Sequence, residues 1–167
     1  MQCLSRVKVY GFVIILLSLT SVVGLARLKA KNDLHPGNPA SNYCVKRDGF
    51  LETYSGPKGE IGICWFGQGA VEEWTLYQYL RGSQTKLKAI DLLLKHEHEH
   101  EPSSLDSESA RRACSFQGGQ VEILLSKERP DFHIALCRLG DQSAVESWTL
   151  YYGVNHFVPL KKLLVEE

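Results

Sequence analysis

An octapeptide occurs twice in this chain, and it constrains the fold more than any other feature. Residues 70–77 have the sequence Ala-Val-Glu-Glu-Trp-Thr-Leu-Tyr, and residues 144–151 differ from them only by a Ser in place of the second Glu. Two cysteines precede each copy at similar spacing, 30 and 10 residues before Trp74 and 34 and 11 residues before Trp148. Self-similarity of this kind indicates duplication of a whole supersecondary unit. The sequence therefore predicts two tandem copies of one small cysteine-bearing module.

The first 26 residues have the composition of a secretory signal peptide. Arg6 and Lys8 precede an apolar run of about 16 residues, which is short for a membrane span of about 20. Gly24 and Ala26 supply the small residues that a cleavage site requires. We therefore expect residues 1–26 to be removed and the protein to be periplasmic or secreted. In the alternative interpretation this segment stays uncleaved and anchors the chain in a membrane.

Four cysteines remain once Cys3 is lost with the signal peptide. An even number of cysteines in an exported chain favours disulfides. No Cys-x-x-Cys pair occurs, which argues against a zinc site and against a thioredoxin-like redox site. Among the three possible pairings, the duplication selects one bridge inside each copy, Cys44–Cys64 and Cys114–Cys137. In the chain-entropy model each bridge would stabilise the fold by roughly 3 kcal/mol.

Each copy is expected to be a short helix, a β-hairpin and a second short helix, which makes the fold class α+β. In the first copy Asn38 is a helix N-cap, and the helix ends at Asp48-Gly49. Aromatic and β-branched residues at 50–54 and 61–66 flank a Gly- and Pro-containing turn and predict the hairpin. Residues 70–80 form the second helix in this interpretation.

The second copy repeats this order. Asp106 or Ser107 starts a helix to about residue 116, residues 121–125 and 133–139 form the hairpin, and a capping-box pattern starts a helix at Ser143. Trp, Thr and Tyr also favour sheets, so a third strand is the alternative for the last helix of each copy. We expect Trp74 and Trp148 in the module cores. The modules would span 38–94 and 107–158.

A polar linker, residues 95–106, is expected between the modules. It contains alternating His and Glu at 96–101, so His96, His98 and His100 are candidate metal ligands. A solvated charged linker is the favoured interpretation, because nothing around the run supplies a second shell. No metal site and no cofactor are therefore expected. Lys and Arg together number 19, as do Asp and Glu, so no field favours nucleic acid.

Several short strings of the first copy resemble a bacterial family of small exported domains, domain of unknown function 333, whose members are labelled haemolysins. They are Gly37 to Cys44, Asp48-Gly49, Gly62 to Phe66 and Glu72 to Trp74. The second copy resembles the family more loosely.

This chain departs from the family at two cysteines of each copy. The cysteine before Glu-Glu-Trp is Val71 in the first copy and Val145 in the second, and the closing cysteine falls at Arg81 and Asn155. The resemblance implies that these two cysteines pair with each other in relatives, which agrees with the intra-module pairing above. No lytic mechanism follows from the residues themselves.

The sequence favours a non-catalytic protein. It contains no Gly-x-Ser-x-Gly, His-Glu-x-x-His or glycine-rich phosphate loop. We expect a disulfide-stabilised module that binds an unknown protein partner in the bacterial envelope or outside the cell, with Ser55–Gly59 and Lys127–Asp131 as candidate contact loops. The alternatives are a protease-inhibitor-like protein and a structural or stress-related periplasmic protein. Contact with a membrane is expected only through an uncleaved signal segment.

Overall fold

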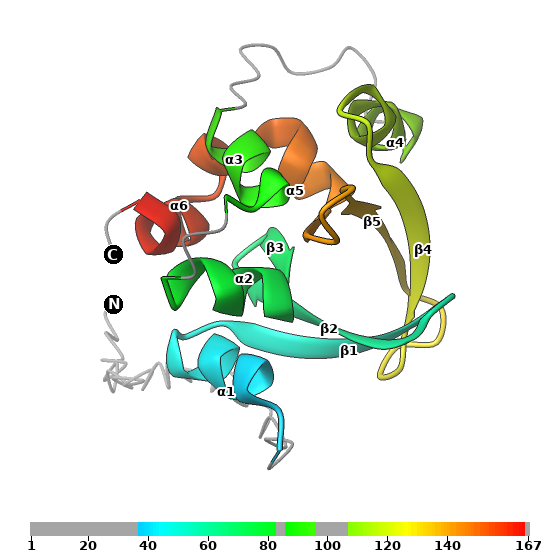
Figure 1. The fold of residues 1–167 in the computed structure, drawn as a ribbon. Coiled ribbons are helices and arrows are strands. Elements are labelled where there is room, and N and C mark those ends of the chain that lie inside the picture. The colour runs from blue at the N-terminus through cyan, green and yellow to red at the C-terminus, as the bar shows by residue number, and fades with distance from the viewer. Residues whose placement is uncertain (1–36, 83–85, 96–106, 166–167) are drawn as a thin grey trace, which may run out of the picture. The chain divides into compact units, whose positions relative to one another are not determined.

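A computed structural model describes residues 37–82, 86–95 and 107–165 of the chain (Figure 1). The signal segment and the His/Glu linker lie outside these residues. The first half contains α1 (Pro39–Lys46), β1 (Phe50–Gly56), β2 (Gly59–Phe66), β3 (Gly69–Glu72), α2 (Glu73–Leu80) and α3 (Lys88–Lys95). The second half contains α4 (Ser107–Phe116), β4 (Gln120–Ser126), β5 (His133–Arg138), β6 (Ala144–Glu146) and α5 (Ser147–Tyr152). A 3-10 turn, Val154–His156, and α6 (Val158–Val165) follow.

The strands of both halves form one closed barrel in the order β1-β2-β3-β6-β5-β4. All neighbouring strands are antiparallel, and the halves meet where Val71 of β3 pairs with Val145 of β6 and where Tyr54 of β1 pairs with Ser126 of β4. The expectation of two separate helix–hairpin–helix modules is therefore wrong, because the strands of both halves share one barrel. Each half supplies three strands, and closing the barrel leaves neither half with unpaired inner edges.

Two threonines of the repeated octapeptide extend the junction between β3 and β6. Ala70 N donates to Thr149 Oγ1 at 2.9 Å, and Ala144 N donates to Thr75 Oγ1 at 2.9 Å. The two bonds are reciprocal, because each half supplies one backbone donor and one hydroxyl acceptor. They satisfy two buried N–H groups at the point where this short strand pair ends.

The core has two layers. One cluster takes at least one residue from every strand and fills the barrel: Tyr54, Ile63, Ala70, Leu124, Ile134, Leu136 and Ala144. Side chains alternate along a strand, so the neighbouring positions Cys64 and Cys137 point outward. There they join a larger cluster with the helices, including Leu76, Ile90, Leu150 and Leu160. Figure 1 shows α1 beside β1 and α4 beside β4. The disulfides tie α1 to β2 through Cys44–Cys64 and α4 to β5 through Cys114–Cys137.

The helices begin close to where the sequence places them, with one systematic difference. Asn38 is the N-cap of α1, as expected, and its side chain accepts hydrogen bonds from Ala40 N and Ser41 N. The segment expected to be helical from residue 70 is a strand as far as Glu72, and the helix starts at Glu73. In the second half Glu146, rather than Ser143, is the N-cap.

Among the described residues, no helix is long and apolar enough to cross a membrane.

Candidate binding grooves

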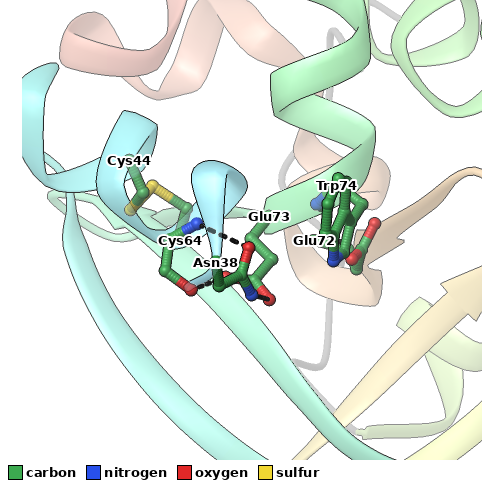
Figure 2. The surroundings of a disulfide bond; sticks show 7 residues. Asn38, Cys44, Cys64, Glu72, Glu73 and Trp74 are labelled. Atoms are coloured by element: carbon green, nitrogen blue, oxygen red, sulfur yellow. Dashed lines mark hydrogen bonds between the residues drawn. A yellow bond between two sulfur atoms is a disulfide. The ribbon is translucent and has the colours of Figure 1, made fainter. Parts of the chain in front are cut away.

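The first groove lies between α1, the outer face of the β1–β2 hairpin and α2. Asn38 Nδ2 donates to Glu73 Oε1 at 2.8 Å, and Ser41 Oγ donates to Glu73 Oε2 at 2.5 Å. Figure 2 shows Glu73 facing Asn38 beside the Cys44–Cys64 disulfide. Gly62 makes room for this carboxylate, because a Cβ at that position would lie 2.4 Å from Glu73 Cδ. The cavity that remains is only about 110 Å³.

The second groove occupies the equivalent place in the other half, between α4, β4–β5 and α5, and Trp65 and Gln68 of the first half also line it. The strand registers establish the equivalence, since Thr53 pairs with Gly62 in one hairpin and Ile123 pairs with Ala135 in the other. Five lining positions correspond. Ser41, Thr53, Glu60, Ile61 and Gly62 line the first groove, and Arg111, Ile123, His133, Ile134 and Ala135 line the second. The second cavity is larger, at about 350 Å³.

The difference in cavity volume follows from two linked differences between the halves, at the positions of Glu73 and Gly62. The position of Glu73 is Ser147 in the second half, a shorter side chain that cannot fill the groove. Because that carboxylate is missing, a methyl group fits where Gly62 stands, and the residue there is Ala135. The two polar groups left over have no partners among the described residues: Ser147 Oγ and Arg111 Nε are both buried without a hydrogen bond.

Neither acidic residue of the first groove is kept in the second, since Glu60 corresponds to His133 and Glu73 to Ser147. Glu60 and Glu73 contribute acidic groups to the first groove, whereas Arg111 and His133 contribute basic groups to the second. Glu146 also lines the second groove, but its carboxylate accepts hydrogen bonds from Trp148 N at 2.9 Å and from the N and Oγ1 of Thr149. Its acceptor capacity is therefore largely used by the start of α5.

The second groove opens beside an exposed apolar surface. Ile123 is 40 % exposed, Leu125 is 53 % exposed and Phe132 is 36 % exposed. Ile123 and Phe132 also line the cavity, together with Trp148. The outer face of β4 and β5 thus continues into the second groove. Chemically, the arrangement can take an apolar group and one hydrogen-bond acceptor.

Four glutamates are buried in the strands, and each has a structural partner. Burial raises the pKa of Glu72 and of Glu146, although both carboxylates accept hydrogen bonds as helix N-caps. Burial also raises the pKa of Glu52, but hydrogen bonds from Arg129, Ser126 and Tyr54 outweigh it, so the pKa lies below its usual value.

The fourth glutamate, Glu122, makes a two-bond pair with an arginine of the neighbouring strand. Arg138 Nε lies 2.9 Å from Glu122 Oε1, and Arg138 Nη2 lies 3.0 Å from Oε2. Hydrogen bonding to Arg138 lowers the pKa of Glu122, and this outweighs the effect of burial.

The structure contains the two expected disulfides, Cys44–Cys64 and Cys114–Cys137. The expectation of two core tryptophans is wrong for Trp74, which is 41 % exposed, and Trp148 is only half-buried. The reason is the late start of α2, because Thr75 and Leu76 face the interior and Trp74 lies outside, edge-on to Tyr77.

The candidate contact loops have structural roles. The loop after β4 contains Arg129, which donates to the buried Glu52 through Nε at 3.1 Å and Nη2 at 2.6 Å. Lys127 of the same loop pairs with Glu60, and Lys58 of the β1–β2 turn lies 3.5 Å from Glu122. Substituting either loop would therefore disturb the barrel as well as any contact surface.

The candidate metal ligands His96, His98 and His100 lie outside the described residues. Within residues 37–82, 86–95 and 107–165, no three His, Cys, Asp or Glu side chains are grouped so as to hold a metal ion. The second groove itself was not predicted from sequence. Aligning the two copies residue by residue would have pointed to it, because Ser41 becomes Arg111 and Glu73 becomes Ser147.

The residues that build the first groove lie in a segment that matches a protein-family model. Residues 36–79 match a family model described as "Domain of unknown function (DUF333)". This DUF333 segment, residues 36–79, contains Asn38, Ser41, Gly62 and Glu73, the residues that build the polar groove. No curated protein and no solved structure matches the chain.

Proposed function

We propose that the chain is a non-catalytic binding protein that acts outside the cytoplasm, and that it contacts a protein partner through the outer face of β4 and β5. The observation that carries this proposal is the second groove, a cavity of about 350 Å³ that opens onto exposed Ile123, Leu125 and Phe132. Contiguous apolar surface beside a cavity is typical of interaction sites.

The two disulfides support an oxidising compartment, either periplasmic or extracellular, because such bonds persist there and are rare in the cytosol. We take the second half as a diverged copy of the DUF333 segment. The equal positions of the disulfides, the glutamate caps and the reciprocal threonines support this duplication. In such a pair the first copy retains the polar groove, and the second is free to change it into a binding site.

A non-catalytic role is supported by how the buried carboxylates are used. A general acid or base has to reach the reacting group of a substrate. Here Glu52 and Glu122 pair with arginines, and Glu72 and Glu146 cap helices. The fifth buried carboxylate, Glu73, accepts hydrogen bonds from Ser41 of α1 and from Asn38, the N-cap of that helix. These groups stabilise the barrel and its helices.

Site-specific photo-crosslinking in the native compartment tests the proposal. A photoreactive amino acid at position 125 should give a defined adduct with a protein partner, because Leu125 lies on the proposed contact face. The same amino acid at position 158 is the matched control, since Val158 is 73 % exposed and lies on α6. Ile123→Asp should reduce the adduct without changing the melting temperature by more than a few degrees, because surface substitutions cost little.

Equal adducts from positions 125 and 158 would contradict the proposed surface. Turnover of a substrate by catalytic amounts of the protein, retained in Ile123→Asp, would contradict the non-catalytic role.

A further inference from the structure

Two N–H donors that line the second groove, Trp65 Nε1 and Arg111 Nε, are buried without a hydrogen-bond partner among the described residues, and of these two side chains Arg111 carries the charge. At the position equivalent to Arg111, Ser41 donates to the carboxylate of Glu73, and the second half has Ser147 in place of that carboxylate. A buried donor without an acceptor destabilises the protein until an acceptor binds.

The rest of the lining indicates what kind of group carries that acceptor. Ile123, Phe132, Ala135 and Trp148 give the cavity an apolar wall, and His133 at its edge is exposed. The volume of about 350 Å³ suits one large side chain with its backbone atoms. The open side continues over the apolar face of β4, along which an extended chain could leave the groove.

We propose that the second groove binds the C-terminal end of a peptide, with the terminal carboxylate on Arg111 and the last, apolar side chain against Trp148 and Phe132. This inference rests on the proposed binding function and names the chemistry of its partner. Guanidinium and carboxylate match in charge and geometry, since a planar fork of N–H donors faces two acceptor oxygens. A long-chain fatty acid shares the carboxylate and an apolar chain, so dodecanoate serves as a second probe.

Titration of the full chain with two forms of one peptide tests the assignment. The probes are N-acetyl-Ala-Ala-Phe with a free carboxylate and the same peptide as its C-terminal amide, and binding is measured by calorimetry. We expect the amide to bind at least about tenfold more weakly, because it lacks the charge that Arg111 pairs with. In the amide-proton NMR spectrum, the Arg111 Nε–H signal should shift with the acid and stay in place with the amide.

Arg111→Gln should weaken binding of the acid about tenfold, and Arg111→Lys should restore only part of it, because a lysine lacks the planar fork. Arg112→Gln is the matched control, since Arg112 is the next residue of α4, is exposed and pairs with Glu108 at 3.4 Å. It should bind the acid as the parent does.

Equal affinity for acid and amide, or unchanged affinity in Arg111→Gln, would overturn the inference. Tighter binding of dodecanoate than of the peptide acid would also overturn it and would make the ligand a lipid. If the peptide fails to bind while the adduct from position 125 persists, this inference is wrong and the proposed function stands.

Discussion

At the scale of single residues, two glycines lie against the two disulfides in the same way. Gly49 and Gly119 follow the first helix of each half, and the sequence suggests that they serve as helix stops. Their positions in the structure give a different reason. A Cβ on Gly49 would lie 2.6 Å from Cys64 Sγ and 2.8 Å from Cys44 Sγ, and one on Gly119 would meet the other disulfide at 2.6 and 2.7 Å. Each bridge therefore packs directly against a backbone that has no side chain.

Alanine at either glycine should destabilise the protein. We expect Gly49→Ala and Gly119→Ala each to lower the free energy of unfolding by about 1–3 kcal/mol, because a buried disulfide has to move. The midpoint of urea unfolding measures this loss of stability when the variant and the parent have the same dependence of unfolding free energy on urea concentration. Gly140→Ala is the control, since its nearest neighbour, Lys88 Nζ, would be 3.9 Å away. A parent-like midpoint for either disulfide-side variant would contradict the packing described.

Some of these residue positions could be predicted from the sequence, and others could not. Cysteine pairing and the Asn38 cap could be predicted, because both depend on short-range order and on the duplication. The location of Trp74 could not, since it depends on which side of α2 faces the interior. Arg111 was missed because a single arginine on a helix gives no signal until its counterpart is known to be Ser41.

At the scale of elements, the repeated octapeptide is a strand followed by a helix. Its first three residues, Ala, Val and Glu, lie in the strand in each half, although the same residue types are also compatible with a helix. The structure is decided by the pairing of Val71 with Val145, a contact between the two copies. Local pattern cannot reveal such a contact, so the sequence placed the helix start too early. Glu72 then caps α2 with its own side chain, accepting from Trp74 N at 2.9 Å and Thr75 N at 2.7 Å.

The loop between β4 and β5 is fastened to β1 by Arg129 and Glu52, and this contact should make stability depend on pH. Because the folded-state pKa of Glu52 is lowered, its contribution is present above the usual carboxyl range. It is lost as the pH falls through the lowered pKa. Glu52→Gln should be less stable at neutral pH and should lose less further stability between neutral pH and about pH 3 than the parent does.

Urea midpoints across this range measure the effect, with Glu128→Gln as the control, since Glu128 is an exposed residue of the same loop. Arg129→Gln should reduce the acid-side loss in the same way as Glu52→Gln. Parallel pH curves for the parent and both variants would show that the loop contact does not contribute.

At the scale of the whole molecule, the two halves form one barrel instead of two independent modules. The copies keep the parts that join them, namely the short strand, the glutamate cap and the threonine. They differ in the side chains that line the two grooves, so one groove is small and polar, and the other is larger and combines an apolar wall with Arg111. We infer that the shared frame preserves the fold while the second groove carries the specific function.

Native-state amide exchange at Ala70 and Ala144 tests whether the two halves are joined into one barrel. Both amides are bonded to a threonine of the other half, so we expect them to exchange only through global unfolding. Thr149→Val should accelerate exchange at Ala70 more than at Ala144, and Thr75→Val should do the reverse. Fast exchange at both amides in the parent, or no selective effect of either variant, would contradict the joining of the two copies into one barrel.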